Sequence, residues 1–292
     1  MWSVNKVVIK QVVRALGSVL FLLVAASALY IETRVPEQNR NWVDYLATTT
    51  IGVTASSTIT LGPVRDWTYG LHDTILAKDW LPGVVIDPST IKAIWFNVEP
   101  FGKFALIGHT FITFELESGE AYSFSIEARR EWGENYSAIK GAFRQYEVAY
   151  TWSTERDALS RRVVKDGHPV RVYKLKTTPA QRMALFTEAV AETNNVATTP
   201  RFYNTFTGNC TNLLAKVVNT AYPGALPYHY SWNLPGASDG YLMDEGYIDV
   251  QGTKEATIAA ANLLPYQEQL ATAATSSSLI FSQTIRSLLV TE

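Results

Sequence analysis

The stretch "FALIGHTFITFELESGEAYSFSIEA", residues 104–128, carries the clearest secondary-structure signal in the chain. Apolar and polar residues alternate on both sides of a central Ser-Gly-Glu, and alternation with a period of two is typical of β-strands. The pattern predicts a hairpin with arms near residues 104–116 and 121–128. If the turn centres near Ser118, His109 lies opposite Glu127, since cross-strand positions are equally distant from the turn.

The segments around this hairpin predict an α+β domain with an antiparallel sheet and packed helices, because strands come first and helices follow. Thr178 precedes a proline and an amphipathic pattern that ends at Asn194 or Asn195, which indicates a capped helix. A second helix is expected from about Cys210 to Asn219. The other expected strands lie within 56–75, at 91–98, in "DALSRRVV" (157–164) and in "HPVRVYKLK" (168–176).

The N-terminus differs from the rest of the chain. Residues 1–14 contain Lys6, Lys10 and Arg14 but no acidic residue, and residues 15–31 carry no charge. This length suits a helix that crosses the hydrocarbon layer, and the basic flank places the N-terminus in the cytoplasm. Either an uncleaved membrane anchor or a cleaved signal peptide fits the pattern, and both export the remainder.

We therefore divide the chain into four parts. These are a membrane anchor or signal segment (1–31), a juxtamembrane linker (32–55), a globular domain (56–250) and a helical C-terminal tail (251–292).

Composition limits the classes of function. The chain has 292 residues, 47% of them hydrophobic, and a formal net charge of −2. This balance supports a buried core, and the near-neutral charge predicts no nucleic-acid partner. A single cysteine excludes an intrachain disulfide framework and a thiolate-rich zinc site. We expect no metal and no cofactor.

Cys210 is the first candidate for chemistry. It follows a Gly-Asn turn at the expected start of a helix, where free N–H groups and a partial positive charge stabilise a thiolate. The same N–H groups can stabilise an oxyanion formed when the thiolate attacks a carbonyl. The competing interpretation is a small buried thiol, which is the commonest role of a lone cysteine.

A thiolate nucleophile needs a base and often a third polar group that orients the base. His109 lies on the first arm of the hairpin, where a strand would fix the direction of its side chain. Glu127 lies across from it and is close enough to hydrogen-bond an imidazole. The alternatives are a core histidine satisfied by a backbone group and a solvated, charged strand end. His72, His168 and His229 are interpreted as surface or packing residues.

Three segments together resemble a known family. They are "GHTFITFELESGEAYSFSIEARREWGENYSAIKGAFRQYE", "FYNTFTGNCTNLL" and "LPGASDGYLMDEGYID", in this order within roughly residues 60–250. The resemblance is to the N-terminal periplasmic domain family of Lnb, the bacterial lipoprotein intramolecular transacylase. The order histidine, polar group, cysteine is also similar to circularly permuted papain-like folds, including the lecithin–retinol acyltransferase group, in which an "NC" motif opens the helix.

The resemblance implies acyl transfer through an acyl-thioester on Cys210, with His109 as base and Glu127 as its orienting group. In the Lnb case it implies that a glycerol-linked acyl chain of a lipoprotein passes to the lipoprotein's own N-terminal amine. Arg129 and Arg130 are candidate contacts for a lipid or substrate anion, with structural ion pairs as the alternative. Asn209 is a candidate substrate-binding residue. The alternative is that Asn209 and Asn212 both hold the turn. For Asp239 the resemblance implies a structural role only.

Three hypotheses therefore follow. The first is an acyltransferase in the bacterial inner membrane, with one membrane span, a periplasmic domain, and lipids or lipoproteins as substrates. The second is a cell-envelope cysteine amidase or peptidase that uses the same residues with water as the acceptor. The third is a non-catalytic envelope protein that keeps this fold. A strongly hydrophobic groove beside Cys210 would favour the first hypothesis, and a polar open cleft would favour the second.

Overall fold

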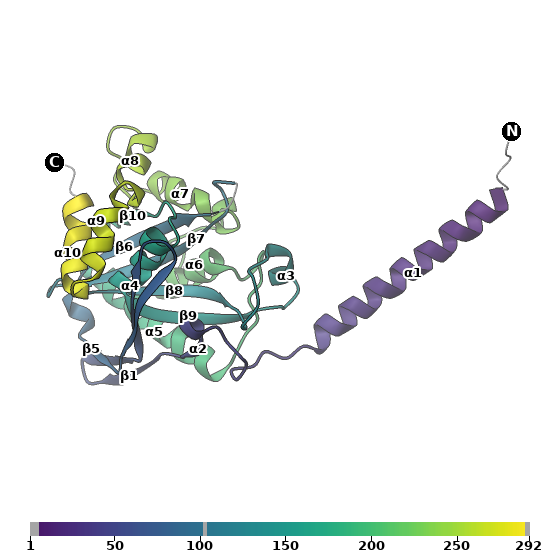
Figure 1. Ribbon diagram of the computed structural model, residues 1–292, viewed down its shortest axis with the longest axis horizontal. Helices are drawn as coiled ribbons and strands as arrows, with labels where there is room; N and C mark the ends of the chain where they lie inside the picture. Colours follow the sequence, from purple (N-terminus) through teal and green to yellow (C-terminus); the bar gives the residue numbers. More distant parts are fainter. Residues whose placement is uncertain (1–5, 102–103, 290–292) are drawn as a thin grey trace.

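A seven-stranded sheet lies at the centre of the computed structural model, which describes residues 6–101 and 104–289 (Figure 1). The strand order is β10-β6-β7-β8-β9-β3-β4, and neighbouring strands are antiparallel except β3 and β9, which pair in parallel. The strands of this sheet are β3 (Val64–Gly70), β4 (Thr74–Leu81), β6 (Ile91–Pro100), β7 (Gly108–Leu116), β8 (Ala121–Arg129), β9 (Glu147–Thr154) and β10 (Arg171–Lys174).

The predicted hairpin is present as β7 and β8. Phe111 pairs with Ser125 and Glu115 pairs with Ala121, so the two strands are related about position 118, as the sequence predicts. Gly119 occupies the turn with φ +88°, a left-handed conformation that glycine adopts without steric cost. The first arm begins at Gly108 and is therefore shorter than the expected 104–116.

Both faces of the sheet are covered by helices, which explains why the central strands are almost entirely buried. On one face Phe114 and Trp152 pack against Phe186 of α5 (Pro179–Thr198), next to α6 (Cys210–Ala221). On the other face Phe111 belongs to a second apolar cluster that includes residues of α4 (Glu155–Leu159), α9 (Gln267–Ala274) and α10 (Ser278–Leu289). The mixed α+β class is confirmed.

The segment "DALSRRVV" is not a strand, and that prediction was wrong. It forms α4 and a π-helical segment, Ser160–Lys165. The Thr154 side chain accepts a hydrogen bond from the backbone N–H of Asp157, which starts the helix. Leu159 and Val163 are one turn apart, so helical winding buries both on the same side.

Much of the segment expected to be a linker is ordered against the sheet. Trp42 and Leu46 are buried, and α2 (Asp44–Ala47) leads into β1 (Ile51–Ala55). A second sheet has the strand order β1-β2-β5, with β2 at Thr58–Gly62 and β5 at Val84–Ile86. Strand β2 lies within the strand region expected at 56–75, whereas β1 and β5 were not predicted, because short segments with little alternation resemble loops in sequence.

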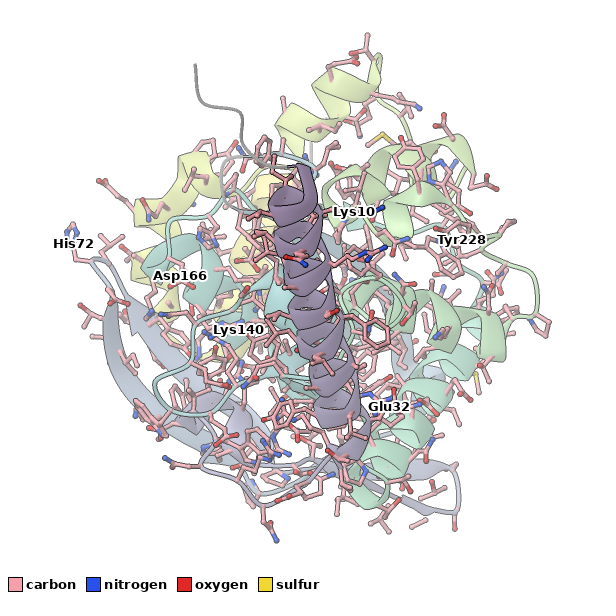
Figure 2. All side chains as sticks on the ribbon, turned by 90° about the vertical axis from the view of Figure 1, so that its right-hand side faces the viewer. Lys10, Glu32, His72, Lys140, Asp166 and Tyr228 are labelled. Carbon is pink, nitrogen blue, oxygen red and sulfur yellow. The ribbon has the colours of Figure 1, made fainter. Side chains whose placement is uncertain are left out.

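The N-terminal helix α1 (Lys6–Thr33) projects away from the domain (Figures 1 and 2). Within the described residues it is the one helix long and apolar enough to cross a membrane, over Val8–Thr33, and none of this window is buried in the protein. Residues 1–5 of the expected basic flank lie outside the described residues. A domain joined to one apolar helix fits a single-pass membrane protein.

The remaining helices lie at the edges of the sheet or in the C-terminal part. They are α3 (Ala138–Ala142), α7 (Ser238–Asp244), α8 (Lys254–Ala260) and the 3₁₀ turns at 88–90, 230–232, 235–237 and 264–266. Phe281 and Ile285 of α10 are fully buried, and Arg286 bonds Glu115 and the buried Glu155. The helical stretches predicted in the tail are therefore present, and α10 is part of the packed domain.

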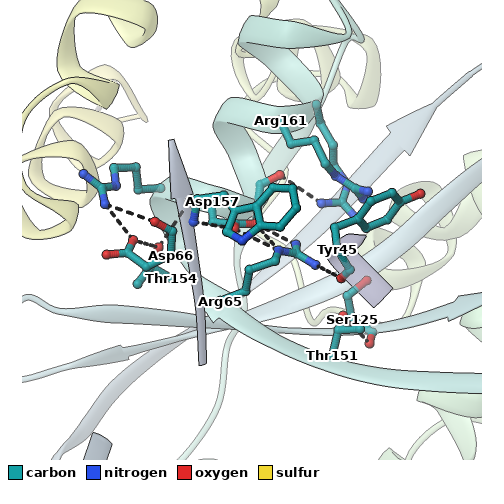
Figure 3. Close-up of polar contacts among 12 residues, drawn as sticks. Tyr45, Arg65, Asp66, Ser125, Thr151, Thr154, Asp157 and Arg161 are labelled. Carbon is teal, nitrogen blue, oxygen red and sulfur yellow. Dashed lines mark hydrogen bonds and ion pairs between the residues drawn. The ribbon is translucent and has the colours of Figure 1, made fainter. Parts of the chain in front are cut away.

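A buried ion pair joins β3 to the start of α4 (Figure 3). Arg65 donates to both carboxylate oxygens of Asp157, with Nη2 2.6 Å from Oδ1 and Nε 2.9 Å from Oδ2. Asp157 also accepts the backbone N–H of Trp67 at 2.8 Å, and Arg65 donates to the carbonyl of Tyr45. All of these groups are satisfied by one another, so removal of one partner leaves a buried charge unpaired.

We expect Asp157→Ala to lower the free energy of unfolding by about 3–5 kcal/mol, because the Arg65 guanidinium would remain buried without its carboxylate. Thermal and urea unfolding of the full chain in detergent measure the effect. Asp44→Ala is the matched control, since the Asp44–Lys78 pair is about half exposed and is expected to contribute less than about 1 kcal/mol. Equal losses in both variants would contradict the prediction.

Candidate active site

Cys210 is the first residue of α6, and the sequence around it builds the start of this helix. The Asn209 side chain accepts the backbone N–H of Asn212 at 2.8 Å, which satisfies one of the free donors of the first turn. The Asn209 and Asn212 amides also donate to the carbonyl of Trp232 at 3.0 and 2.7 Å. The two asparagines therefore hold the turn that presents Cys210.

His109 lies at the start of β7 and faces β8. Its Nε2 is 2.7 Å from the Ser125 hydroxyl and 3.4 Å from Glu127 Oε1, so His109 and Glu127 lie opposite each other as the hairpin predicts. The ring stacks on Phe111 with 5.8 Å between ring centroids. Because Nε2 is occupied on this side, Nδ1 is the nitrogen left to face the thiol.

Glu127 is held by several donors at once. Its Oε1 accepts the Ser125 hydroxyl at 2.8 Å and Arg162 Nη2 at 2.9 Å, and Arg161 Nη2 lies 3.5 Å away. Burial alone raises the pKa of this carboxyl, but His109 and the two arginines outweigh burial and hold the pKa well below its usual range. Glu127 is therefore a carboxylate that favours a protonated His109.

The Cys210 thiol and the His109 ring change each other's pKa. Burial acts against both charged forms, yet Glu127 and Cys210 raise the pKa of His109, while the charge and hydrogen bonding of His109 lower the pKa of Cys210. The backbone of Thr110 and the hydroxyl of Thr211 add hydrogen bonds that favour the thiolate. These directions favour the thiolate–imidazolium pair over the neutral pair, and the thiolate is the reactive form of a cysteine nucleophile.

Cys210, His109 and Glu127 line one open cleft of about 610 Å³. Its walls combine aromatic rings with cationic groups, and it is neither a purely apolar groove nor a purely polar one. The other lining residues include Tyr45, Trp67, Tyr69, Phe101, Arg130, Tyr136, Arg161, Arg162, Lys165, His168 and Tyr203.

A second cavity, of about 90 Å³, lies beside α6 and is lined almost entirely by apolar atoms. Thr211, the residue after the nucleophile, lines it and hydrogen-bonds Thr110 at 2.9 Å. Leu214, Ala215 and Val218 of the same helix continue the wall.

The residues predicted to bind substrate separate in the structure. Arg130 lines the cleft and bonds the Tyr45 hydroxyl. Arg129 does not line it, because its guanidinium donates to the carbonyls of Leu46 and Ala47 and to the Gln38 side chain. By the period of two Arg129 shares the face of Glu127, but these contacts hold its guanidinium away from the cleft, whereas Arg130 follows the last residue of β8.

Asn209 and Asp239 both have structural contacts. Asn209 is buried, and besides capping α6 its amide donates to the Thr205 carbonyl at 3.0 Å. Asp239 is buried and accepts from Tyr173 at 2.8 Å, with Arg171 Nε 2.9 Å away, which fastens α7 to β10.

Two arginines that line the cleft were not predicted from the sequence. Arg161 and Arg162 come from the segment mistaken for a strand, and Arg162 joins Glu99 to Glu127 through contacts of 2.7 and 2.9 Å. Arg161 lies over the Tyr45 ring, and its buried Nε has no hydrogen-bond partner among the described residues. Ser125 could have been found, because it shares the face of Glu127 by the period of two.

The other histidines differ in their surroundings. His72 is exposed in a turn, and His229 stacks on Tyr241. His168 contacts Glu99 at 2.6 Å and lines the cleft, which its loop-like sequence did not indicate. Among residues 6–101 and 104–289, no group of three or more His, Cys, Asp or Glu side chains is arranged to hold a metal ion.

A family model described as the Lnb N-terminal periplasmic domain matches residues 79–234, more than half of the chain. The chain belongs to this family. The matched range contains Cys210, His109 and Glu127. No curated protein and no solved structure matches the chain. A periplasmic Lnb domain behind one apolar helix fits a single-pass protein whose domain lies in the periplasm.

Proposed function

We propose that this Lnb-type protein is a cysteine acyltransferase, anchored in the bacterial inner membrane, that takes acyl chains from esters of lipoproteins or lipids. The observation that carries the proposal is that Cys210, at the start of α6, lines the same cleft as the His109–Glu127 pair of the β7–β8 hairpin. Its histidine-before-cysteine order supports a circularly permuted papain-like fold. The helix α1 would keep the cleft next to ester bonds in the outer leaflet.

The reaction follows from the protonation states of the pair. The Cys210 thiolate attacks the ester carbonyl carbon, and the backbone N–H groups at the start of α6 face the oxyanion that forms. The ester C–O bond then breaks, and the leaving alkoxide takes the proton held by His109. This step leaves a neutral imidazole and an acyl-thioester on Cys210.

The second half returns the enzyme to its first state. An amine acceptor attacks the thioester carbonyl while neutral His109 takes its proton, the C–S bond breaks, and the thiolate leaves. Glu127 stabilises the imidazolium at both ends of the cycle and fixes the ring through Nε2. With a lipoprotein substrate, donor ester and acceptor amine would belong to the same molecule.

The lining of the cleft supports a substrate with an anion and an acyl chain. Arg161 and Arg130 are cations on the cleft wall, and Arg161 has a buried N–H without a partner within the described part of the chain. The apolar cavity beside α6 offers space for apolar groups next to Thr211, the residue after Cys210. The openness and mixed polarity of the cleft support the second candidate, an amidase or peptidase of the cell envelope.

The test uses the full chain in proteoliposomes with a synthetic diacylglyceryl-cysteine peptide, followed by mass spectrometry of the products. Transacylation yields a peptide acylated at its amine and lacking one ester chain, and this product should disappear in both Cys210→Ala and His109→Ala. Release of free fatty acid would identify a hydrolase, and cleavage of a peptide bond would identify the second candidate. Products that ignore both substitutions would overturn the proposal.

A further inference from the structure

Large apolar side chains are exposed on the side of the domain from which α1 leaves. Trp132, Ile139, Phe143 and Phe206 are 58%, 74%, 54% and 65% exposed. We call these four residues the apolar rim. Exposed apolar residues that gather on one side of a soluble surface mark an interaction site, whereas single ones need no explanation.

The rim residues are neighbours in space. Ile139 lies on α3, and Phe143 is the residue directly after this short helix, where its backbone N–H donates to the Lys140 carbonyl. The loop that carries Phe206 is tied to α3, because the Thr205 hydroxyl donates to the Ala138 carbonyl at 2.7 Å. In Figure 1 α3 lies on the side of the domain nearest to the end of α1, and Figure 2, viewed from that side, shows Lys140 of α3 on the face turned toward the viewer.

The rim also borders the catalytic cleft. Tyr136 lies between Trp132 and Ile139 in sequence and lines the cleft, as does Tyr203, three residues before Phe206. The two tyrosine rings meet edge to face with centroids 6.3 Å apart. A surface that covered the rim would therefore lie at the mouth of the cleft that contains Cys210.

Residues 34–41, which we call the tether, join α1 to the domain and place a bilayer at this surface. Only residues 34–41 separate the end of α1 from the buried Trp42, a span of about 28 Å even if fully extended. Contacts shorten it further, since Arg34 donates to Gln145 at 3.2 Å and Arg40 pairs with Glu131 at 2.8 Å.

Rim residues adjoin these tether contacts directly. The backbone N–H of Trp132 donates to the Asn41 carbonyl at 2.8 Å. Arg144, next to Phe143, donates to the Ile31 carbonyl at the end of α1. The rim is therefore held at the level where α1 leaves the hydrocarbon layer.

We propose that the apolar rim is a membrane-docking surface that enters the interface of the same bilayer that α1 crosses, with the cleft mouth facing the lipid headgroups. A Trp and other large apolar side chains at this depth are typical of interfacial anchoring. The proposal concerns binding to lipid and does not depend on which reaction Cys210 performs.

The test places a fluorescent reporter in the rim of the full chain. A Cys210→Ser background removes the only native cysteine, and Ile139→Cys then carries an environment-sensitive dye in vesicles of phosphatidylethanolamine and phosphatidylglycerol. The matched control is Val85→Cys on β5, which is 67% exposed and lies on the other side of the domain from α3 in Figure 1. Lipids with a spin label near the headgroup should quench most of the emission at 139 and little at 85.

A dye at 139 with water-like emission and no more quenching than at 85 would overturn the proposal. Energy transfer between labelled copies without quenching by lipid would assign the rim to a second copy of the chain, and would overturn it as well. Because the background lacks the Cys210 thiol and docking is read from the dye alone, the result does not depend on thiol-dependent catalysis. Failure of docking and failure of the proposed acyltransferase are therefore separate outcomes.

Discussion

Cys210→Ala is expected to abolish acyl transfer and hydrolysis, with a loss of about 10⁴-fold or more in kcat. The thiolate is the atom that attacks the carbonyl in every enzymatic hypothesis for this cleft, and water is a poor substitute in a site shaped to activate sulfur. Burst kinetics with a chromogenic ester, together with the intact mass of the protein, measure the effect. The wild type should gain one acyl group that hydroxylamine removes, and the variant should gain none.

The loss should occur without unfolding, which the same preparations can establish. Cys210 is small and its backbone is held by the Asn209 cap, so the circular dichroism and the thermal midpoint should stay close to those of the wild type. A burst of full size in a folded Cys210→Ala protein would refute the nucleophile assignment, and no burst in either protein would leave the non-catalytic hypothesis in place.

His109→Gln is expected to slow alkylation of Cys210 by iodoacetamide at neutral pH by roughly 10²-fold or more, and turnover by still more, because the base is also lost. In the wild type His109 lowers the pKa of the thiol against the effect of burial. Without the imidazolium, burial is no longer offset and the pKa of Cys210 rises above its ordinary value. A smaller share of the thiol is then ionised at neutral pH than in the wild type.

The sign of the pH dependence makes this prediction specific. Reactivity of the wild type should be lost as pH falls through the lowered pKa of Cys210, and turnover should be lost as pH rises through the raised pKa of His109, because the imidazolium that protonates the leaving group is then deprotonated. Glu127→Gln serves as the graded variant, since it removes the charge that raises the pKa of His109 and should move that upper limit to lower pH. Unchanged alkylation rates in both variants would show that Cys210 ionises independently of the hairpin.

The part of the site that the sequence predicts is the part governed by local periodicity. Strand alternation on both sides of Ser118 places His109 opposite Glu127, and a turn before an apolar helix places Cys210 at its start. These conclusions need only neighbouring residues and the geometry of one hairpin or one helix. The meeting of hairpin and helix is a tertiary contact, and the family resemblance supplied the reason to expect it.

The features that the sequence did not predict depend on contacts between residues that are far apart in the chain. Arg161 and Arg162 are in a π-helical segment whose apolar residues fit neither a period of two nor one of 3.6 clearly, so their place under Glu127 was hidden. Arg129 and Arg130 look equivalent in sequence, yet the backbone of Leu46 and Ala47 takes one of them out of the cleft. The order in the expected linker likewise comes from its contacts with residues about 80 to 150 positions later, such as Arg129 and Val196.

Helix α10 has a consequence for how the protein is made. Its Arg286 bonds the buried Glu155 and Glu115, and its Phe281 fills the cluster under Phe111, the ring on which His109 stacks. Residues 278–289, which are synthesised after the residues of the cleft, therefore complete the layer beneath His109. Until they arrive, the buried carboxylate of Glu155 lacks Arg286 and an apolar face stays open, so an exported chain that stops before residue 278 would meet periplasmic proteases without a finished domain.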